Sequence, residues 1–212
     1  NGAGKSTTLD LICGKTMPTA GSITFDDRDI TGMHEHSRAR HGVGRKFQVP
    51  SVFKELSVRE NLQVANSRRP GPWHTIFTWP GREGRERLEE IATFTGLQDR
   101  LEARASYLSH GETQWLEIAM LVAQNSSLIL MDEPTAGMTH AETAKTAEIF
   151  NSLRGQHTLI VVEHDMSFVR EIGDVISVLH QGQLLAEGTV AEIETDPRVK
   201  EAYLGSGGIS HA

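Results

Sequence analysis

The sequence has one cysteine in 212 residues, Cys13, so no internal disulfide bond can form. No leader with a charged start, an apolar middle and small final residues precedes it, as a secretory signal would require. We therefore expect a protein of a reducing, cytosolic compartment rather than a secreted one.

Long hydrophobic runs are also missing. The longest apolar stretches, at 128–131 and 159–162, are far shorter than the roughly 20 residues that a membrane helix needs. Any association with a membrane is therefore expected to come through a partner.

Basic residues are outnumbered, because 21 Lys and Arg stand against 28 Asp and Glu and give a net charge of -7. Such a chain has no overall positive field for a phosphate backbone, which argues against a nucleic-acid partner. Hydrophobic residues make up 38% and charged residues 23%, as is typical of a packed globular protein. The length suits one domain, or one domain with an insertion.

The first motif stands at the very start of the chain and matches the second half of the phosphate-binding pattern G-x-x-x-x-G-K-[ST]. Glycines let backbone N–H groups converge on an anion where a helix begins. The lysine would reach the outer phosphates, the serine would be a Mg²⁺ ligand, and the threonine would add a phosphate contact. The alternative is a plain turn and helix start. The predicted site comprises Asn1, Gly2, Ala3, Gly4, Lys5, Ser6 and Thr7.

The residues after this motif predict the helix that it requires. Leu9, Ile12 and Cys13 are the apolar positions of a helix over 8–13, and Gly14 can end it. Since the first half of the motif would precede Asn1, we expect the chain to be a piece of a longer protein that lacks the first strands of its sheet.

From residue 128 onward, apolar strands alternate with helices, which is typical of a largely parallel sheet. A short strand that ends in a turn, a terminal hairpin around Gln181-Gly182 and a last helix after Asp196-Pro197 are also predicted. The predicted strands are 22–25, 128–131, 158–162, 175–179 and 183–186, and the predicted helices of this half are 142–154 and 166–172.

The middle of the chain predicts helices at 56–65, 85–94 and 113–124, the first with a capping box of Ser57 and Glu60. Between the first two, Pro and Gly residues around Trp73 and Trp79 break every regular pattern. We interpret this segment as a loop whose tryptophans pack on neighbouring helices, with a partner-docking surface as the alternative. We assign 1–48 and 125–212 to a core that carries the phosphate-binding motif, and 49–124 to a helical subdomain.

Three histidines, His34, His36 and His41, gather in the polar run 33–41. A metal site would need their nitrogens to point at one centre. We favour a solvated surface for this run.

Two adjacent carboxylates, Asp132 and Glu133, follow the apolar strand at 128–131. A buried strand would deliver them at the carboxyl edge of the sheet, where α/β proteins bind ligands. There Asp132 would hold Mg²⁺, directly or through water, and Glu133 would be the general base toward an attacking water. The alternative is an ordinary boundary between a strand and a turn.

A second helix start also has the features of an anion site. Leu108-Ser109-His110-Gly111-Glu112 fits the capping box S-x-x-E, and offers a hydroxyl and a glycine. The chain thus holds two phosphate-binding elements about a hundred residues apart, and one nucleotide rarely needs both from one chain.

Taken in order, these motifs resemble those of the ATP-binding subunits of ATP-binding-cassette (ABC) transporters, over essentially the whole chain. The resemblance implies an α/β fold of the P-loop NTPase class, with a mostly parallel sheet and an inserted helical subdomain. It implies ATPase activity, with ATP and Mg²⁺ as cofactors. The implied roles are nucleotide binding by Asn1 to Thr7, Ser109 and Gly111, Mg²⁺ binding by Ser6, Gln48 and Asp132, and catalysis by Glu133, His164 and Gln48, with Ala136 to Thr139 in the D-loop position.

The resemblance also implies partners. In this family two ATP-binding subunits pack head to tail, and each ATP lies between the Walker A motif of one and the signature motif of the other. Two transmembrane permease subunits and, indirectly, a solute-binding protein complete the assembly. We therefore expect a peripheral protein on the cytoplasmic face of the inner membrane.

The signature motif departs from the family's usual form, because His110 stands where Gly is commonest and Glu112 where Gln is common. Both residues resemble variants of the hydrophobic amino-acid uptake branch. Within that branch, the segments that resemble the urea-type subunit are Gly44 to Gln48, Leu108 to Gly111 and Gln114 to Ile118, with Ala136 to Thr139 in agreement. We therefore expect an importer for urea, with a branched-chain amino-acid importer as the alternative.

Other ABC ATPases are less favoured. An exporter subunit stays open, whereas a DNA-repair ATPase would carry a long coiled coil between the Walker A and signature motifs, and that interval is too short here. A GTPase would need an N-K-x-D motif, which the sequence lacks.

Overall fold

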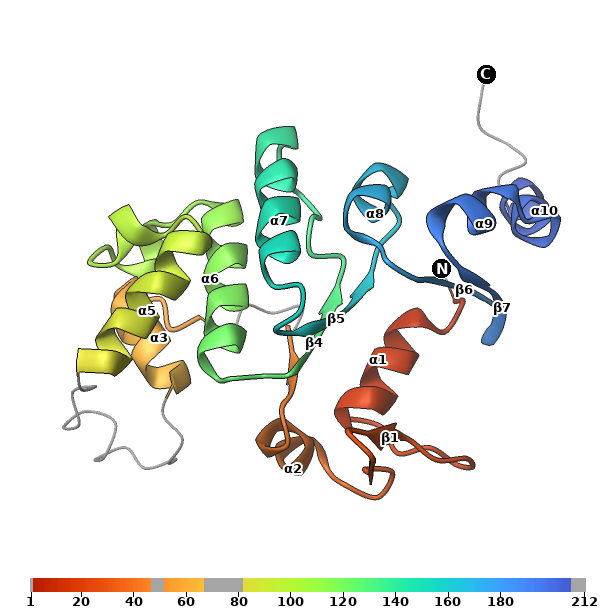
Figure 1. The fold of residues 1–212 in the computed structure, drawn as a ribbon, viewed down its shortest axis with the longest axis horizontal. Coiled ribbons are helices and arrows are strands. Elements are labelled where there is room, and N and C mark those ends of the chain that lie inside the picture. Colours follow the sequence, from red (N-terminus) through yellow and green to blue (C-terminus); the bar gives the residue numbers. More distant parts are fainter. Residues whose placement is uncertain (1, 47–51, 67–81, 207–212) are drawn as a thin grey trace.

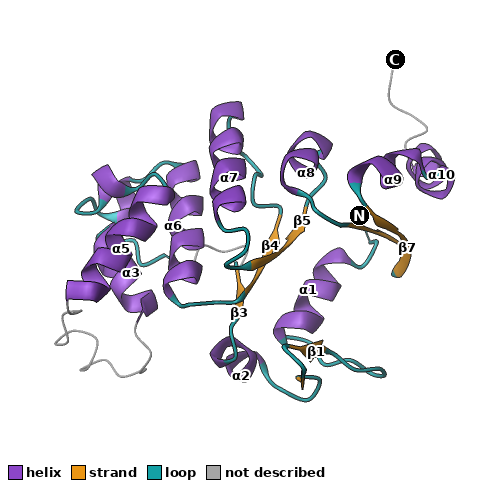
Figure 2. Cartoon of the chain, in the orientation of Figure 1, coloured by secondary structure: helices purple, strands orange, loops and turns teal. Residues whose placement is uncertain are grey.

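The computed structural model describes residues 2–46, 52–66 and 82–206. Within these ranges the strands form a three-stranded parallel sheet and two separate antiparallel pairs, which lie apart from it (Figure 2). The parallel sheet has the order β3-β4-β5 and consists of β3 (Val43–Arg45), β4 (Leu128–Asp132) and β5 (Thr158–Val162).

Strand β4 is the centre of the parallel sheet and is covered on both faces. Ile129 and Met131 belong to one hydrophobic core, and Leu128 and Leu130 belong to another. This alternation follows from the two-residue period of a strand, and two covered faces are the usual situation of a parallel sheet. The two cores therefore hold helices against opposite faces of β4.

Helix α1 (Lys5–Cys13) covers one face through Leu9 and Cys13, which pack with Val43 and the β4 leucines. It ends at Gly14, whose φ of 82° is left-handed, as the sequence predicts. The opposite face is covered by three helices that lie side by side in Figure 1, namely α6 (His110–Ala123), α7 (His140–Ser152) and α8 (Met166–Ile172).

The middle of the chain forms the predicted helical cluster. Helices α3 (Val58–Asn66) and α5 (Arg82–Phe94) pack on α6 through Leu62, Leu88 and Leu116, which are all fully buried. The capping box at α3 is confirmed, because the Ser57 N–H donates to Glu60 Oε2 and the Glu60 N–H donates to Ser57 Oγ. Short 3₁₀ turns η1 (Gln98–Arg100) and η2 (Ala105–Tyr107) lead into α6. The segment around Trp73 and Trp79 lies outside the described residues.

The C-terminal hairpin is confirmed but differs from the prediction in one respect. Strand β6 (Ile176–His180) was expected in the parallel sheet, yet within the described residues it pairs only with β7 (Gln183–Gly188), antiparallel. Gln181 and Gly182 have φ values of 49° and 78°, and two such residues form the tight turn that suits an antiparallel pair. Helices α9 (Val190–Thr195) and α10 (Pro197–Ser206) follow.

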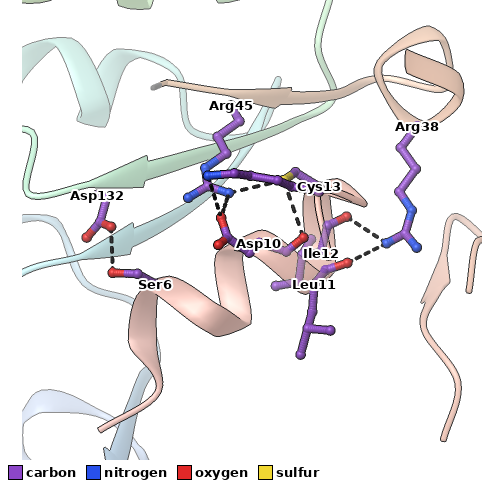
Figure 3. A network of polar contacts seen from close by, with 9 residues as sticks. Ser6, Asp10, Leu11, Ile12, Cys13, Arg38, Arg45 and Asp132 are labelled. Carbon is purple, nitrogen blue, oxygen red and sulfur yellow. Dashed lines mark hydrogen bonds and ion pairs between the residues drawn. The ribbon is translucent and has the colours of Figure 1, made fainter. Parts of the chain in front are cut away.

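The first hairpin joins β1 (Thr24–Phe25) and β2 (Arg28–Asp29) through Asp26 and Asp27, and α2 (Glu35–Arg40) follows it. The run 33–41, predicted to be solvated, is corrected at one residue: Arg38 is fully buried. Burial lowers the pKa of Arg38, and its guanidinium donates to four carbonyl oxygens at 2.6–3.0 Å. Figure 3 shows two of these acceptors, the carbonyls of Leu11 and Ile12, and the other two are those of Thr31 and Met33. The sequence pattern missed it because two of its acceptors, the carbonyls of Leu11 and Ile12, lie 27 and 26 positions away in the chain.

The histidines of this run agree with the surface interpretation. His34, His36 and His41 are exposed, and the first two rings stack with centroids 6.2 Å apart. The described part of the chain contains no group of three or more His, Cys, Asp or Glu residues that could hold a metal ion. None of its helices is long and apolar enough to cross a membrane.

Candidate functional site

The candidate site lies at the carboxyl edge of the parallel sheet. Strands β4 and β5 run parallel with Asp132 opposite Val162. The residues that follow each strand therefore emerge next to each other, at the edge where α/β proteins bind ligands. These residues are Glu133 after β4, and Glu163 and His164 after β5.

The predicted Mg²⁺ ligands Ser6 and Asp132 contact each other although 126 positions separate them. Ser6 Oγ donates a hydrogen bond of 2.8 Å to Asp132 Oδ2 (Figure 3). Ser6 lies in the first turn of α1, and Asp132 ends β4. Because α1 packs on β4 through Leu9, the fold brings the helix start to the strand end.

The loop before α1 has the backbone of an anion site. Gly2 and Gly4 both have positive φ values, 86° and 91°, which glycine adopts without strain. The Gly182 N–H, in the turn between β6 and β7, donates to the Ala3 carbonyl at 3.1 Å. Lys5, Ser6 and Thr7 then form the first turn of the helix, where free N–H groups and the helix dipole favour an anion.

Arg45 holds α1 against the sheet. Its side chain is 9% exposed, and its guanidinium contacts the Asp10 carboxylate and lies 3.1 Å from the Cys13 sulfur (Figure 3). Burial lowers the pKa of Arg45, but the hydrogen bonds to Cys13 and Asp10 outweigh it, so that the pKa is raised. The ion pair fixes β3 to the helix that carries Lys5 and Ser6.

Glu133 has an unusual backbone for a residue with a side chain. Its φ is 46°, a left-handed conformation that costs roughly 1–3 kcal/mol outside glycine. The Glu133 N–H donates to the Val162 carbonyl at 2.9 Å, and its own carbonyl accepts from the Ala136 N–H at 3.2 Å. This turn points the chain away from β4 immediately after Asp132.

The side chains of Glu133 and His164 lie close together. His164 Nδ1 is 3.6 Å from Glu133 Oε1, and the histidine and glutamate side chains are 69% and 48% exposed. An exposed pair of this kind adds little to stability. The stability of the fold therefore does not account for the closeness of these two side chains.

The segment predicted to be a second anion site is the start of helix α6. Ser109 caps α6 in a complete capping box. The Ser109 N–H donates to Glu112 Oε2 at 2.8 Å, and the Glu112 N–H donates to Ser109 Oγ at 3.1 Å. His110, which departs from the family's usual signature, has its Nε2 3.0 Å from the Ala136 carbonyl oxygen. The signature segment thus contacts the segment at the D-loop position in the same chain.

Gly111 lies directly against the start of α7. A Cβ at this position would stand 2.3 Å from Glu142 Oε1, so only glycine fits without a shift. The pKa of Glu142 is held below its ordinary value, first by the Thr139 backbone N–H and then by the Thr139 hydroxyl, with the Gly111 N–H contributing less. The absence of a side chain at Gly111 therefore has a structural reason as well as the predicted nucleotide role.

The structure joins the predicted residues in two separate groups. The first group lies at the edge of the sheet, where Ser6 contacts Asp132 and Glu133 lies beside His164. The second group is Ser109 and its neighbours at the start of α6, and among the described residues no hydrogen bond or ion pair joins Ser109 to any of those four. Helix α6 and helix α1 lie on opposite faces of β4 (Figure 1). The predicted residues Asn1 and Gln48 lie outside the described residues, so their roles stay predictions.

Sequence reasoning missed Glu163. Its side chain is 1% exposed although it is a carboxylate. The available signal was its position, a charged residue between the apolar strand 158–162 and His164. Such a residue looks like the first surface position after a strand unless its acceptor role is known.

Two family models match the chain. Residues 1–136 match the model described as ABC transporter, and residues 183–209 match the model described as branched-chain amino acid ATP-binding cassette transporter. The chain belongs to the ABC transporter family. It is an ABC ATPase, as predicted.

Curated relatives of this ABC ATPase agree along almost its entire length. The high-affinity branched-chain amino acid transport ATP-binding protein LivG of Salmonella typhimurium is 38% identical, over 97% of this chain and 84% of LivG. BraF of Pseudomonas aeruginosa, with the same description, is 37% identical over the same shares. The lipopolysaccharide export system ATP-binding protein LptB of Acidithiobacillus ferridurans is 32% identical, over 97% of this chain and 82% of LptB.

The fold prediction for this ABC ATPase is also confirmed. A crystal structure of an ATP-binding cassette of an ABC transporter, in its ADP conformation, matches with a TM-score of 0.81 and 29% identity, over 97% of this chain and 85% of that chain. LivG and BraF agree with the amino-acid alternative better than with the urea interpretation.

Proposed function

We propose that this ABC ATPase is the ATP-hydrolysing subunit of an importer for branched-chain amino acids. The main support for this choice of solute is the 38% identity to LivG over 97% of the chain. BraF and the family match at 183–209 support it as well. Urea stays the second candidate, on the resemblance of Gly44 to Gln48 and of Gln114 to Ile118.

The phosphates of ATP would bind at the start of α1. Backbone N–H groups of residues 1–7 and the Lys5 ammonium would hold them, with Thr7 adding a hydroxyl contact. The donor set also fits Mg²⁺, because Ser6 Oγ and Asp132 Oδ2 are hard oxygen donors only 2.8 Å apart. Mg²⁺ commonly takes one or two carboxylates and completes its shell with phosphates and waters. Gln48 would be a further ligand, and the bound ion would draw charge from the phosphates.

Hydrolysis would use the two side chains that follow β4 and β5. Glu133 would accept a proton from the water that attacks the γ-phosphate, and His164, 3.6 Å away, would hold the γ-phosphate and Glu133 in place. Gln48, in the segment that follows β3 in the sequence, is proposed to contribute to catalysis as well. The exposure of both side chains in the single chain leaves them open to the nucleotide.

The second anion site would act on the ATP of another subunit. Ser109 and Gly111 lie at the start of α6, the helix that covers the other face of β4, so we propose that they bind the γ-phosphate held by a partner in a head-to-tail dimer. Residues 49–124 would form the helical subdomain that contacts two permease subunits, fed by a solute-binding protein. The assembly would place this chain on the cytoplasmic face of the inner membrane.

The experiment is uptake of labelled leucine and labelled urea by cells of the source organism, with and without the intact parent gene. A Glu133→Gln copy of that gene controls for loss of the protein. We expect leucine uptake to fall and urea uptake to stay at the parental level in both strains. Loss of urea uptake alone would contradict the amino-acid proposal and favour urea, and loss of neither would contradict both.

A further inference from the structure

We propose that Glu163 is a positioning residue that fixes Glu133 and His164 relative to each other for ATP hydrolysis. This inference rests on the proposed hydrolytic function of the same edge. It concerns a carboxylate that would touch neither the nucleotide nor the metal, and that acts through the backbone of two loops.

The Glu163 carboxylate bridges the segments that follow β4 and β5. Its Oε1 accepts the Thr135 N–H at 3.2 Å and the Thr135 hydroxyl at 2.6 Å. Its Oε2 accepts the His164 N–H at 3.1 Å. One side chain therefore ties the turn that contains Glu133 to the residue that carries the imidazole.

Burial makes this placement costly unless it serves a purpose. The side chain is 1% exposed, and a buried carboxylate is tolerated only when its oxygens are hydrogen-bonded or paired. Among the described residues, its one ion-pair neighbour is His164, whose Nδ1 lies 3.8 Å from Oε2. No lysine or arginine of the described chain forms an ion pair with it, so the three hydrogen bonds are what hold it in place.

The backbone of Glu133 explains why such a clamp is needed. A residue held at a φ of 46° persists only when its surroundings over-determine it. On one side the Glu133 N–H is bound to the Val162 carbonyl at 2.9 Å. On the other side, two residues later, Thr135 is bound by Glu163. Removing the second attachment would let the turn relax and carry the Glu133 carboxylate away from the attacking water.

The expected effect falls on turnover rather than on binding. Displacing a reacting group by about 1 Å can lower a rate about 100-fold. Lys5 and Ser6 have no hydrogen bond or ion pair with Glu163 in the described structure, so ATP affinity should be kept. For Glu163→Ala we expect kcat to fall about 10- to 100-fold while the KM and Kd for ATP change by less than about threefold.

The experiment uses the intact transporter complex in lipid vesicles. Turnover is measured against ATP concentration, and Kd is measured with a non-hydrolysable ATP analogue. Glu163→Gln keeps the volume and one carbonyl oxygen, so it should bind one of the two loops and give a kcat between those of the parent and Glu163→Ala. The Thr135→Val variant replaces the hydroxyl by a methyl group and keeps the N–H, so it should lower kcat in the parent. The same substitution should lower kcat little further in the Glu163→Ala background.

A matched control separates position from stability. Leu153→Ala opens the core near the end of α7, where Leu153 is 3% exposed, and should lower the melting temperature without lowering kcat at a temperature where the protein is folded. The inference is overturned if Glu163→Ala and Glu163→Gln turn over ATP at the parental rate, or if all their loss follows the melting temperature as in Leu153→Ala. It is also overturned if the Thr135→Val and Glu163→Ala effects simply add.

Failure of the proposed function would look different. In that case the parental complex would not hydrolyse ATP, or Glu133→Gln would hydrolyse it at the parental rate. Parental activity that Glu133→Gln abolishes and Glu163→Ala leaves intact would refute the positioning role alone.

Discussion

At the scale of single residues, different side chains at the edge of the sheet are proposed to bind ATP and to act in its hydrolysis. The backbone N–H groups and the lysine proposed to hold most of the phosphates lie at the start of α1, whereas His164, proposed to contact only the γ-phosphate, follows β5 and is 69% exposed. Its side chain lies 3.6 Å from Glu133, while Ser6 of the phosphate loop binds Asp132 instead. Substitutions at this histidine should therefore affect the chemical step first.

We predict that His164→Ala lowers kcat about 100-fold and changes the Kd for ATP by less than about threefold, since removing one positioned group typically costs about 10²–10⁴ in rate. Turnover by the reconstituted complex and equilibrium binding of an ATP analogue are the two measurements. His180→Ala, at the end of β6, is the control and should keep both values. A loss of affinity in His164→Ala that equals its loss of turnover would contradict this division.

At the scale of elements, helix α1 is held by two arginines that approach it from different segments. Arg45 forms an ion pair with Asp10 of α1 (Figure 3). Arg38 donates to the carbonyls of Leu11 and Ile12 at the C-terminal end of α1, where the helix dipole favours a cation. Gly14 must lack a side chain there, because a Cβ would stand 2.8 Å from Arg38 Nε. The helix that presents Lys5 and Ser6 is thus fixed at the opposite end from the phosphates.

We predict that Arg38→Lys lowers the free energy of unfolding by about 2 kcal/mol, because an ammonium cannot serve four carbonyls in the plane of a guanidinium. Arg38→Ala should cost more, since it leaves the same carbonyls without a donor. Urea denaturation of the purified protein measures both. His36→Ala, exposed on the same helix, should change the unfolding free energy by less than about 0.5 kcal/mol. A similarly small effect at Arg38 would refute the assignment.

Helix α7 has a capping contact that should respond to acid. Hydrogen bonds from Thr139 lower the folded-state pKa of Glu142 below its ordinary value of 4.5. A lowered pKa gives stability that is present above the ordinary value and is lost as the pH falls through the folded-state value. The stability difference between the parent and Glu142→Gln should therefore be largest near pH 7 and shrink below pH 4.5, as measured by chemical denaturation at each pH. A difference that stays constant with pH would contradict hydrogen bonding to the ionised carboxylate as the cause.

At the scale of the whole molecule, the two predicted anion sites lie on helices that cover opposite faces of β4. A single chain can therefore present both at once only to two different nucleotides. The proposed head-to-tail pair would solve this, because each interface would combine Ser6 and Lys5 of one chain with Ser109 of the other. The γ-phosphate would join the two chains until it is cleaved.

We predict that Glu133→Gln stabilises an ATP-bound dimer, because the amide keeps the shape of the side chain but cannot accept the proton of the attacking water. In the intact protein with ATP and Mg²⁺, size-exclusion chromatography with light scattering should show a dimer, and turnover should fall at least about 100-fold. The same variant with an added Ser109→Arg should stay monomeric, as should the parent with ADP. A dimer that forms equally with ADP would contradict the role of the γ-phosphate.

The sequence by itself determined the features that depend on near neighbours. The periodicity of 158–162 and 166–172 predicted β5 and α8 to the residue, and the Ser109 and Ser57 capping boxes were readable because their partners lie three positions away. The order of the motifs also identified an ABC ATPase. These properties follow from local hydrogen bonds and from the spacing of apolar side chains.

Only the tertiary structure decided which distant groups meet. The contact of Ser6 with Asp132, the burial of Arg38 and the contact of Glu163 with Thr135 all join atoms from separate elements. A carboxylate after a strand looks the same in sequence whether it faces water or accepts three hydrogen bonds. The environment of this carboxylate is set by the pairing of β4 with β5, which no local sequence pattern records.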